Sequence, residues 1–432
     1  MDYWSFCSHN WSCDKAHGVM ISNLKNKSIL ILGLGKEGLD TLSFLQSKFP
    51  EKVIGVADKK EKNLESKNIK KYFGEKYLSA IGEYEVIIKS PGVPFDLIED
   101  RANGKIITSQ TDIFLSERSS DTIGVTGTKG KSTTCLFIYN ILKKELEKPV
   151  YLLGNIGEPV LNYIDKEGIF IYELSSFQLQ TATHSPHIAI FLNLFKDHLD
   201  QHTSFKEYAN SKVNIFKNQS DSDILIYNKN DSKIIKLIKQ TESQKIPFNP
   251  KEKIPGTPIY LEPILKVADI FNISKEASLN NINRADFLPH RMEKCGKYRG
   301  VEFINDSAAT IPEATIEAIN NLQDVKSLIV GGVDKGGDYG SLAQKISESS
   351  IQTVIIFPDT GKKIKNYLEG DFLKKPLIIE AKNMKEAVEI AYKKTEDGIC
   401  LMSPASSSFN MFSSYKDRGD KFKKFVEKYG KK

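Results

Sequence analysis

A glycine-rich segment with two lysines carries the strongest chemical signal in this sequence of 432 residues. Residues 123–134 read IGVTGTKGKSTT, so a β-branched run leads into a loop and then into a helical stretch. Backbone N–H groups of such a loop bind phosphate oxygens, Lys131 would contact the β- and γ-phosphates, and the Ser132 hydroxyl would contact Mg²⁺. The spacing departs from the standard P-loop, because Val125 stands where that pattern has its first glycine. The predicted phosphate-binding residues are Gly127, Thr128, Lys129, Gly130, Lys131, Ser132 and Thr133.

A second glycine loop, ILILGLGKEG at residues 29–38, follows an earlier apolar run. Glycines at this spacing permit a tight turn and let the backbone approach a pyrophosphate at the start of a helix. Asp58 follows the next apolar run, where such folds contact a ribose. Alone, the motif suggests a dinucleotide, and a tight turn without a ligand explains it as well. Because residues 123–134 are the stronger phosphate loop, we interpret the earlier loop as a substrate pocket.

Polar residues follow several other apolar runs. Glu173 closes the run at 169–172 and could hold a metal ion, although a solvated carboxylate is the simpler explanation. The segment NLFKDHLDQH at 193–202 follows the run at 188–192, and its His198 lies between two aspartates. This arrangement suits Mg²⁺ or phosphate chemistry, and a helix cap by an aspartate is the alternative. By composition alone, Lys212 is expected to be one more solvated lysine.

The C-terminal third contains similar strand-end loops. Arg291 precedes a strand that ends at Asp306, and the two would suit base stacking and ribose contacts or, alternatively, a salt bridge. The loop at 331–337 contains Lys335, and the loop at 403–409 contains several serines. Lysine and hydroxyl groups in two such loops favour a small anionic ligand.

Short apolar runs alternate with amphipathic helical stretches along most of the chain, a pattern typical of parallel α/β sheets. We predict strands at 28–32, 53–57, 86–88, 123–126, 169–172, 188–192, 223–227, 327–330, 353–357, 377–380 and 399–402. The Pro-rich stretch 246–263 is predicted to be a loop. The predicted organisation is a disordered extension at 1–23 and domains at 24–118, 119–288 and 289–432.

Composition excludes several classes of protein. Sixty-one Lys+Arg against 55 Asp+Glu give a net charge of +6 without a long basic block, which argues against a nucleic-acid partner. Five scattered cysteines favour a reducing, cytoplasmic compartment. No apolar run approaches the roughly 20 residues of a membrane span, and residues 1–20 do not have the pattern of a signal peptide.

Taken together, the motifs resemble the Mur ligase family. They are GTKGKST, GNIG at 154–157, ELSSFQL at 173–179, DHxDxH, PHR, NDS and SPxxxSF, and in this order they cover residues 24–432. The resemblance implies three α/β domains: a Rossmann-like N-terminal domain that binds UDP, a central P-loop ATPase domain with a mostly parallel sheet, and a Rossmann-like C-terminal domain that carries the amino acid. The loops GLGxxG, SPGVP and NDSxxT are most similar to the branch that adds D-glutamate to UDP-N-acetylmuramoyl-L-alanine in peptidoglycan precursor synthesis.

The resemblance also implies a reaction and residue roles. ATP converts the acceptor carboxylate into an acyl phosphate, which the amine of the amino acid then attacks. Lys131 would bind the γ-phosphate, and two Mg²⁺ ions would be held by Ser132, Glu173, His198 and a carbamylated Lys212. The nucleotide would contact Arg291 and Asp306. The UDP-sugar would contact Gly33, Gly35, Lys36, Asp58, Ser90, Pro91, Gly92 and Asn155. The glutamate would contact Thr310, Lys335, Ser408 and Tyr415. The enzyme is expected to be a monomer.

Three positions depart from the family pattern. Ala308 stands where a lysine is often found, Asn410 replaces an acid, and Pro263 stands near an expected asparagine. A ligase for another amino acid, such as L-glutamate, is therefore the nearest alternative. A nucleotide-dependent dehydrogenase built on residues 33–38 leaves residues 123–134 unexplained. A non-catalytic P-loop module would not need Glu173, His198 and Lys212 together.

Overall fold

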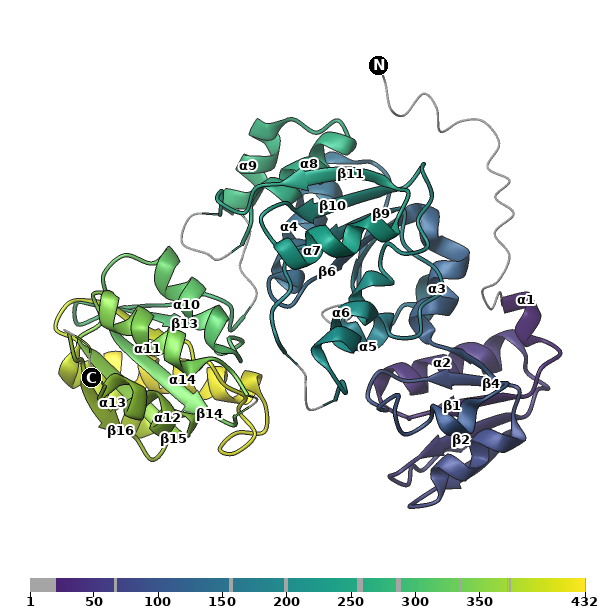
Figure 1. Ribbon diagram of the computed structural model, residues 1–432, viewed down its shortest axis with the longest axis horizontal. Coiled ribbons are helices and arrows are strands. Elements are labelled where there is room, and N and C mark those ends of the chain that lie inside the picture. The colour runs from purple at the N-terminus through teal and green to yellow at the C-terminus, as the bar shows by residue number, and fades with distance from the viewer. Residues whose placement is uncertain are drawn as a thin grey trace. The chain divides into compact units, whose positions relative to one another are not determined.

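The computed structural model describes residues 21–431 apart from 66–67, 155–157, 198–200, 255–258, 285–288, 335, 371 and 373. Its strands form three sheets flanked by helices (Figure 1). The chain divides into two compact units. The first contains the described residues up to Leu194 together with 201–250 and 262–284, and the second contains those of 195–200, 251–261 and 285 onward. None of the described helices is both long and apolar enough to span a membrane.

The first sheet is entirely parallel, with the strand order β3-β2-β1-β4-β5. Its central strands are buried apolar runs, as expected for strands covered on both faces. The strands are β1 (Ile29–Leu32), β2 (Ile54–Asp58), β3 (Ile69–Phe73), β4 (Val86–Lys89) and β5 (Ile106–Thr108). The helices are α1 (Ile21–Leu24), α2 (Lys36–Lys48) and α3 (Gln110–Arg118), with short 3₁₀ turns η1 (Tyr77–Glu83) and η2 (Asp100–Ala102).

The second sheet is also parallel and has the order β11-β10-β9-β6-β8-β7. Its strands are β6 (Thr122–Thr126), β7 (Val150–Gly154), β8 (Ile169–Glu173), β9 (Ile188–Phe191), β10 (Ile224–Asn228) and β11 (Gln244–Phe248). Its helices are α4 (Lys131–Glu145), α5 (Ser176–Leu179), α6 (Phe205–Val213), α7 (Ser232–Leu237), α8 (Glu262–Ile270) and α9 (Lys275–Arg284). The 3₁₀ turns are η3 (Ser119–Asp121), η4 (Leu161–Tyr163) and η5 (Ile238–Gln240).

One continuous apolar core joins the first two sheets, which explains why both lie in one unit. Phe114 of α3 packs edge-on against Phe170 and Tyr172 of β8, with ring centroids 5.3 and 5.8 Å apart. The buried hydroxyls of Thr111 and Tyr172 are 2.8 Å apart and share a hydrogen bond. The two sheets are therefore packed against each other through α3.

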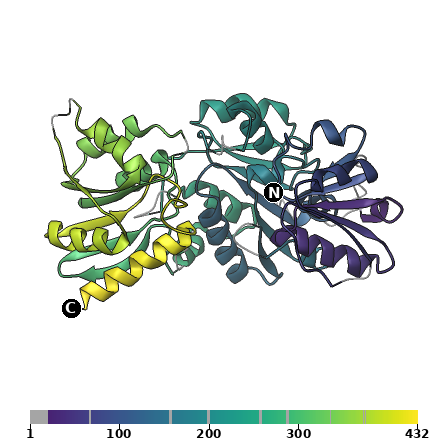
Figure 2. The ribbon, with the colours of Figure 1, turned by 90° about the horizontal axis from the view of Figure 1, so that it is seen from below.

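The second unit contains the third sheet, ordered β12-β13-β17-β14-β15-β16, in which only β12 and β13 pair antiparallel. The strands are β12 (Glu293–Tyr298), β13 (Val301–Asn305), β14 (Val325–Gly332), β15 (Thr353–Asp359), β16 (Leu377–Glu380) and β17 (Gly398–Met402). Helices α10 (Pro312–Asn321), α11 (Tyr339–Glu348) and α12 (Thr360–Leu368) cover one face. Helices α13 (Met384–Lys394) and α14 (Tyr415–Gly430, yellow in Figure 2) cover the other.

The α/β fold class with parallel sheets is confirmed, and all eleven predicted strands are present within three residues. The loop predicted at 246–263 is wrong at both ends, because β11 extends to Phe248 and α8 begins at Glu262. Pro247 is tolerated in β11 because this is an edge strand, where a missing N–H costs no ladder bond. Of the predicted extension 1–23, residues 21–23 belong to α1, which is anchored by the buried Leu24, and the rest lies outside the described residues. The three domain boundaries stay predictions.

Candidate active site

The phosphate loop predicted at 127–130 lies between β6 and α4. Gly127 has a φ of 155°, and a Cβ there would stand 3.0 Å from Cβ of Leu192. Gly130 occupies the N-cap of α4 with a φ of 85°. Both positions therefore need glycine, because a side chain would be strained at either and would also be crowded at Gly127. The first N–H groups of α4 therefore follow the loop directly, which is the arrangement that binds phosphate at helix N-termini.

Asn193, the second residue after β9, holds this loop in place. Its Oδ1 accepts hydrogen bonds from the N–H groups of Thr128 and Lys129 at 3.0 and 2.9 Å. Its Nδ2 donates to the carbonyl of Lys129 at 3.0 Å. Sequence reasoning did not assign Asn193 a role, although its place just after a buried strand of the same sheet was a usable signal.

Two lysine ammonium groups converge on the loop. Lys131 Nζ donates to the carbonyls of Gly127 and Thr128 at 2.9 and 3.0 Å. Lys212 of α6 is only 1% exposed, and its Nζ donates to the same Gly127 carbonyl at 3.0 Å. The composition-based expectation of a solvated Lys212 is therefore wrong, because α6 packs against the sheet and directs this side chain inward. Two cations on one carbonyl make the loop strongly attractive to anions.

Tyr208, one turn before Lys212 on α6, also contacts the loop. Its hydroxyl lies 2.9 Å from Oγ1 of Thr128, and both side chains are buried. Lys212 Nζ lies 4.9 Å from the centroid of the Tyr208 ring, a cation–π distance. Sequence reasoning missed Tyr208, because only the fold reveals that it faces the loop.

Ser132 and Glu173 place a hydroxyl and a carboxylate beside the loop. Both are 1% exposed, Ser132 in the first turn of α4 and Glu173 at the end of β8. Burial raises the pKa of the neighbouring Cys135 thiol, the Glu173 charge raises it further, and the Lys131 charge lowers it. A hydroxyl and a carboxylate are ligands that Mg²⁺ prefers, so the donor set fits this ion. The described residues contain no cluster of three or more His, Cys, Asp or Glu side chains that could hold a metal; His198 and Asn155 lie outside them.

The segment after Glu173 forms a polar cluster around α5. Ser175 caps this helix in a capping box with Gln178. His202 Nε2 lies 3.1 Å from the Ser176 hydroxyl, and the imidazole stacks on Phe177. Burial lowers the pKa of His202, so the imidazole is neutral at physiological pH.

The first glycine loop is held by two residues predicted to face a ligand. Ser90 Oγ donates to the carbonyl of Gly33 at 2.6 Å, and Asp58 Oδ2 accepts from the Leu34 N–H at 2.6 Å. A Cβ on Gly38 would lie 2.0 Å from the Gly33 carbonyl oxygen, so this position needs glycine. A Cβ on Gly35 would meet nothing within 4 Å, and Lys36 is exposed. The structure therefore brings Gly33, Asp58 and Ser90 together and leaves the tip of the loop open, with Pro91 and Gly92 directly following Ser90.

A direct hydrogen bond connects the first loop to the second sheet. Gln178 Nε2 donates to Glu37 Oε1 at 2.8 Å, and Glu37 lies in the first turn of α2. The chain runs from Glu173 to Gln178 in five residues. Both predicted ligand loops thus belong to one unit, and α5 lies between them.

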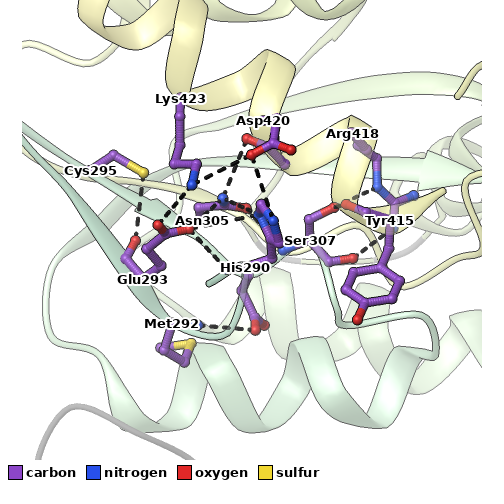
Figure 3. Close-up of polar contacts among 12 residues, drawn as sticks. His290, Met292, Glu293, Cys295, Asn305, Ser307, Tyr415, Arg418, Asp420 and Lys423 are labelled. Atoms are coloured by element: carbon purple, nitrogen blue, oxygen red, sulfur yellow. Dashed lines mark hydrogen bonds and ion pairs between the residues drawn. The ribbon is translucent and has the colours of Figure 1, made fainter. Parts of the chain in front are cut away.

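In the second unit, the segment around Arg291 is fixed by its neighbours (Figure 3). His290 and Met292 have positive φ values of 66° and 50°. The His290 N–H donates to Glu293, and the Met292 N–H donates to Asp306 Oδ1 at 3.3 Å. Asp306 Oδ2 also accepts from Ser403. The residue that follows Arg291 is therefore hydrogen-bonded to Asp306, and the nucleotide contacts expected of Arg291 and Asp306 stay predictions.

The loops predicted to bind the amino acid are held together by Arg418. This guanidinium is fully buried and donates to the Ser307 hydroxyl and carbonyl and to the Ser406 carbonyl at 2.8–3.0 Å. Ser307 in turn donates to the carbonyl of Tyr415. Ser408 is buried in the same 403–408 segment, Thr310 is partly exposed, and Lys335 lies outside the described residues. Sequence reasoning gave Arg418 no role, although arginine is scarce in this lysine-rich chain.

Comparisons with known proteins agree with this picture. Residues 125–279 match the Mur ligase middle domain, and residues 290–405 match the Mur ligase, glutamate ligase domain. A UDP-N-acetylmuramoylalanine–D-glutamate ligase from Ruminiclostridium cellulolyticum is 32% identical over 94% of this chain and 97% of its own length. One from Clostridioides difficile is 30% identical, covering 93% and 98%.

Solved structures show the same fold. A MurF ligase from Thermotoga maritima in complex with ADP superposes with a TM-score of 0.58 at 15% identity, covering 95% of this chain and 98% of that one. A pseudomurein peptide ligase type C from Methanothermus fervidus gives 0.56 at 18% identity, covering 94% and 100%. With its family domains and its full-length relatives, the chain belongs to the Mur ligase family of ATP-dependent ligases.

Proposed function

We propose that this chain adds D-glutamate to UDP-N-acetylmuramoyl-L-alanine with ATP, through an acyl phosphate, in the cytoplasmic synthesis of peptidoglycan precursors. The observation that carries the proposal is the convergence of Lys131 and the buried Lys212 on the loop at 127–130, beside the carboxylate of Glu173. The full-length relatives that carry this enzyme name supply the substrates. The chain is proposed to act as a monomer.

The first half-reaction needs a bound triphosphate and a carboxylate held in line with it. Loop N–H groups and Lys131 bind the phosphates and stabilise the charge that develops on the transferred group. Asn193 holds the N–H groups of Thr128 and Lys129 in fixed positions. The first glycine loop holds the acceptor within the same unit. Attack of the acceptor carboxylate on the γ-phosphorus releases ADP, and attack of the glutamate amine then displaces phosphate.

Mg²⁺ would be held by Ser132 and Glu173, with His198 and a carbamylated Lys212 as the proposed partners of a second ion. When bound, Mg²⁺ neutralises phosphate charge. Lys212 supports this role through its burial and its position at the Gly127 carbonyl, where a carbamate would face the loop. Arg291 and Asp306 are proposed to contact the nucleotide. Thr310, Lys335, Ser408 and Tyr415 are proposed to hold the two glutamate carboxylates.

The deciding experiment is phosphate release by the purified chain with ATP, Mg²⁺ and UDP-N-acetylmuramoyl-L-alanine across a panel of amino acids. We expect release that depends on D-glutamate, with a product mass equal to the acceptor plus one glutamyl residue. Phosphate release with L-glutamate but not with D-glutamate would show that L-glutamate is the substrate. Absence of amino-acid-dependent release with every acceptor would overturn the ligase function.

The carbamate on Lys212 can be tested separately. Lys212→Ala should lose at least about 10²-fold in kcat and regain part of it with added short carboxylates, which can take the place of the lost carbamate. Intact mass spectrometry of labile adducts and activity after CO₂ depletion provide independent readouts. Wild-type activity that does not depend on CO₂, together with an alanine variant that carboxylates do not rescue, would contradict a functional carbamate on Lys212.

A further inference from the structure

Lys89, the last residue of β4, is a buried cation with few partners. Its side chain is only 2% exposed, yet its Nζ makes a single long hydrogen bond, 3.4 Å to the carbonyl of Ser90. No carboxylate among the described residues lies within 4.0 Å of it. A buried ammonium in this condition is costly unless an anion compensates it. Ser90 is one of the two residues that hold the first glycine loop, the other being Asp58.

Glu37 is the carboxylate whose charge acts on Lys89, and its own oxygens are incompletely hydrogen-bonded. Its Oε1 accepts from Gln178, while its Oε2 is buried without a hydrogen-bond partner among the described residues. The Lys89 charge lowers the pKa of Glu37 and the Glu37 charge raises that of Lys89, so the two groups interact without forming an ion pair. Two buried, opposite charges are thus held apart at the substrate loop.

Lys89 also acts electrostatically on residues around α5, the helix that follows Glu173. The charges of Lys89 and Lys212 both lower the pKa of His202, the imidazole that contacts α5. Gln178 on α5 contacts Glu37. Lys89 therefore lies between the first glycine loop at 33–38 and the residues around α5 that follow Glu173.

We propose that Lys89 binds an anionic oxygen of the acceptor, a carboxylate or a diphosphate, and that Glu37 balances the Lys89 charge until that anion arrives. The inference rests on the proposed function and adds two binding residues to it. An anion seated at Lys89 supplies the missing acceptor of its N–H groups, and it repels the nearby carboxylate of Glu37. Glu37 then takes up a proton from solvent and keeps its hydrogen bond to Gln178.

The ionisation of both groups supports this exchange. Burial raises the pKa of Glu37 to about 7, with Asp40 adding to the rise and Lys89, Lys36 and Gln178 opposing it. On β8, burial raises the pKa of the Tyr172 hydroxyl, and the Glu37 charge raises it further. Burial lowers the pKa of Lys89 to about 8. An arriving anion raises both values, so acceptor binding at pH 7.5 should be accompanied by uptake of up to about one proton.

The first test compares Lys89→Met with Lys105→Met. Methionine preserves the buried length of Lys89 and removes its charge. Lys105 is a matched control because its Nζ also donates to a backbone carbonyl, that of Gly82, and it precedes the neighbouring strand β5, whereas Lys89 ends β4. Lys89→Met should raise the KM for the acceptor at least about 30-fold, with the KM for ATP within about twofold of wild type. Lys105→Met should leave both values unchanged.

The second test is calorimetric binding of UDP-N-acetylmuramoyl-L-alanine at pH 7.5 in buffers of different ionisation enthalpy. The wild type should take up protons, and Glu37→Gln, which can keep the Gln178 contact, should lose at least half of that uptake. UDP-N-acetylglucosamine, which has the diphosphate and lacks the carboxylate, identifies the anion. Weaker binding of both ligands by Lys89→Met assigns the diphosphate, and weaker binding of the full acceptor alone assigns the carboxylate.

Each outcome decides between explanations. A folded Lys89→Met variant with an unchanged acceptor KM overturns the role of Lys89. Proton uptake that is identical in wild type and Glu37→Gln overturns the role of Glu37. If the wild type ligates glutamate and either of these results is found, only this inference is overturned. A wild type that does not bind the acceptor overturns the proposed function as well.

Discussion

The two glycine loops of the first unit have the same local plan and different supports. Each follows a buried strand of a parallel sheet and leads into a helix, α2 or α4. The loop at 33–38 is held by the carboxylate of Asp58 and the hydroxyl of Ser90. The loop at 127–130 is held by the carboxamide of Asn193.

The difference shows how a support can select the charge of a ligand. A carboxylate under a loop holds its N–H groups and also repels phosphate, whereas a carboxamide makes the same bonds without charge. The loop at 127–130 adds Lys131 and Lys212, which suits a polyphosphate. The loop at 33–38 has one buried cation, Lys89, and the buried carboxyl of Glu37. It suits a ligand of lower charge density.

The largest effect is expected at the phosphate loop. Lys131→Ala should lower kcat by at least about 10³-fold, because its charge stabilises the transferred phosphoryl group. Phosphate release measures the loss. Lys148→Ala, which removes a surface ion pair with Asp121 in the same unit, should retain full activity. Near-normal turnover of Lys131→Ala would exclude this lysine from the reaction.

Asn193→Asp tests the neutral support directly. The variant keeps the shape and the acceptor oxygens, loses the donor to the Lys129 carbonyl and places a negative charge under the loop. We expect the KM for ATP to rise roughly 10- to 100-fold with little change in the KM for the acceptor. Steady-state kinetics with each substrate varied in turn separate the two constants. An unchanged KM for ATP would refute the charge argument.

Glu37→Gln tests the buried carboxyl through stability. The pKa of Glu37 is about 7 in the folded state against 4.5 for the ordinary group, so between these values the folded chain holds a proton that the unfolded chain has lost. Its contribution to stability therefore falls as pH rises from 4.5 through 7. Glutamine should raise the free energy of unfolding by about 1–2 kcal/mol at pH 8, relative to wild type, and by only about a quarter of that amount at pH 5. Urea unfolding at both pH values, without ligands, gives the comparison.

The smallest effect is expected for Asp58→Asn. The amide oxygen can still accept from the Leu34 N–H, and only the charge disappears. The KM for the acceptor should fall by up to about threefold, the size of a partly exposed charge effect, and the KM for ATP should not change. A large rise in the acceptor KM would instead place the Asp58 carboxylate in direct contact with a sugar hydroxyl.

The sequence allowed the central strands to be predicted because they are buried on both faces and read as uninterrupted apolar runs. It did not reveal β3, β5, β7, β11 or β12, all of which lie at sheet edges. In β3, two exposed lysines interrupt the pattern. Edge strands are less completely covered, so an apolar run is a less dependable signal for them, although the edge strand β16 was predicted.

The candidate site was predictable where backbone geometry requires glycine, as at Gly127 and Gly130. It was not predictable where a common residue acquires its role through tertiary position. Lys212 was singled out by family resemblance alone, and Asn193, Tyr208, Lys89 and Arg418 were not assigned roles. A lysine, an asparagine or a tyrosine gives no local signal of which surface it will face.

The packing of Phe114 against Phe170 and Tyr172 has a consequence for how the first unit comes apart. Since the two sheets share one core, neither retains a complete interior without the other. Unfolding of the first unit should be a single cooperative event. Amide hydrogens of β1 and β8 should then exchange with the same free energy of opening. A fragment ending at Arg118 would expose Phe114 to water and should not fold alone.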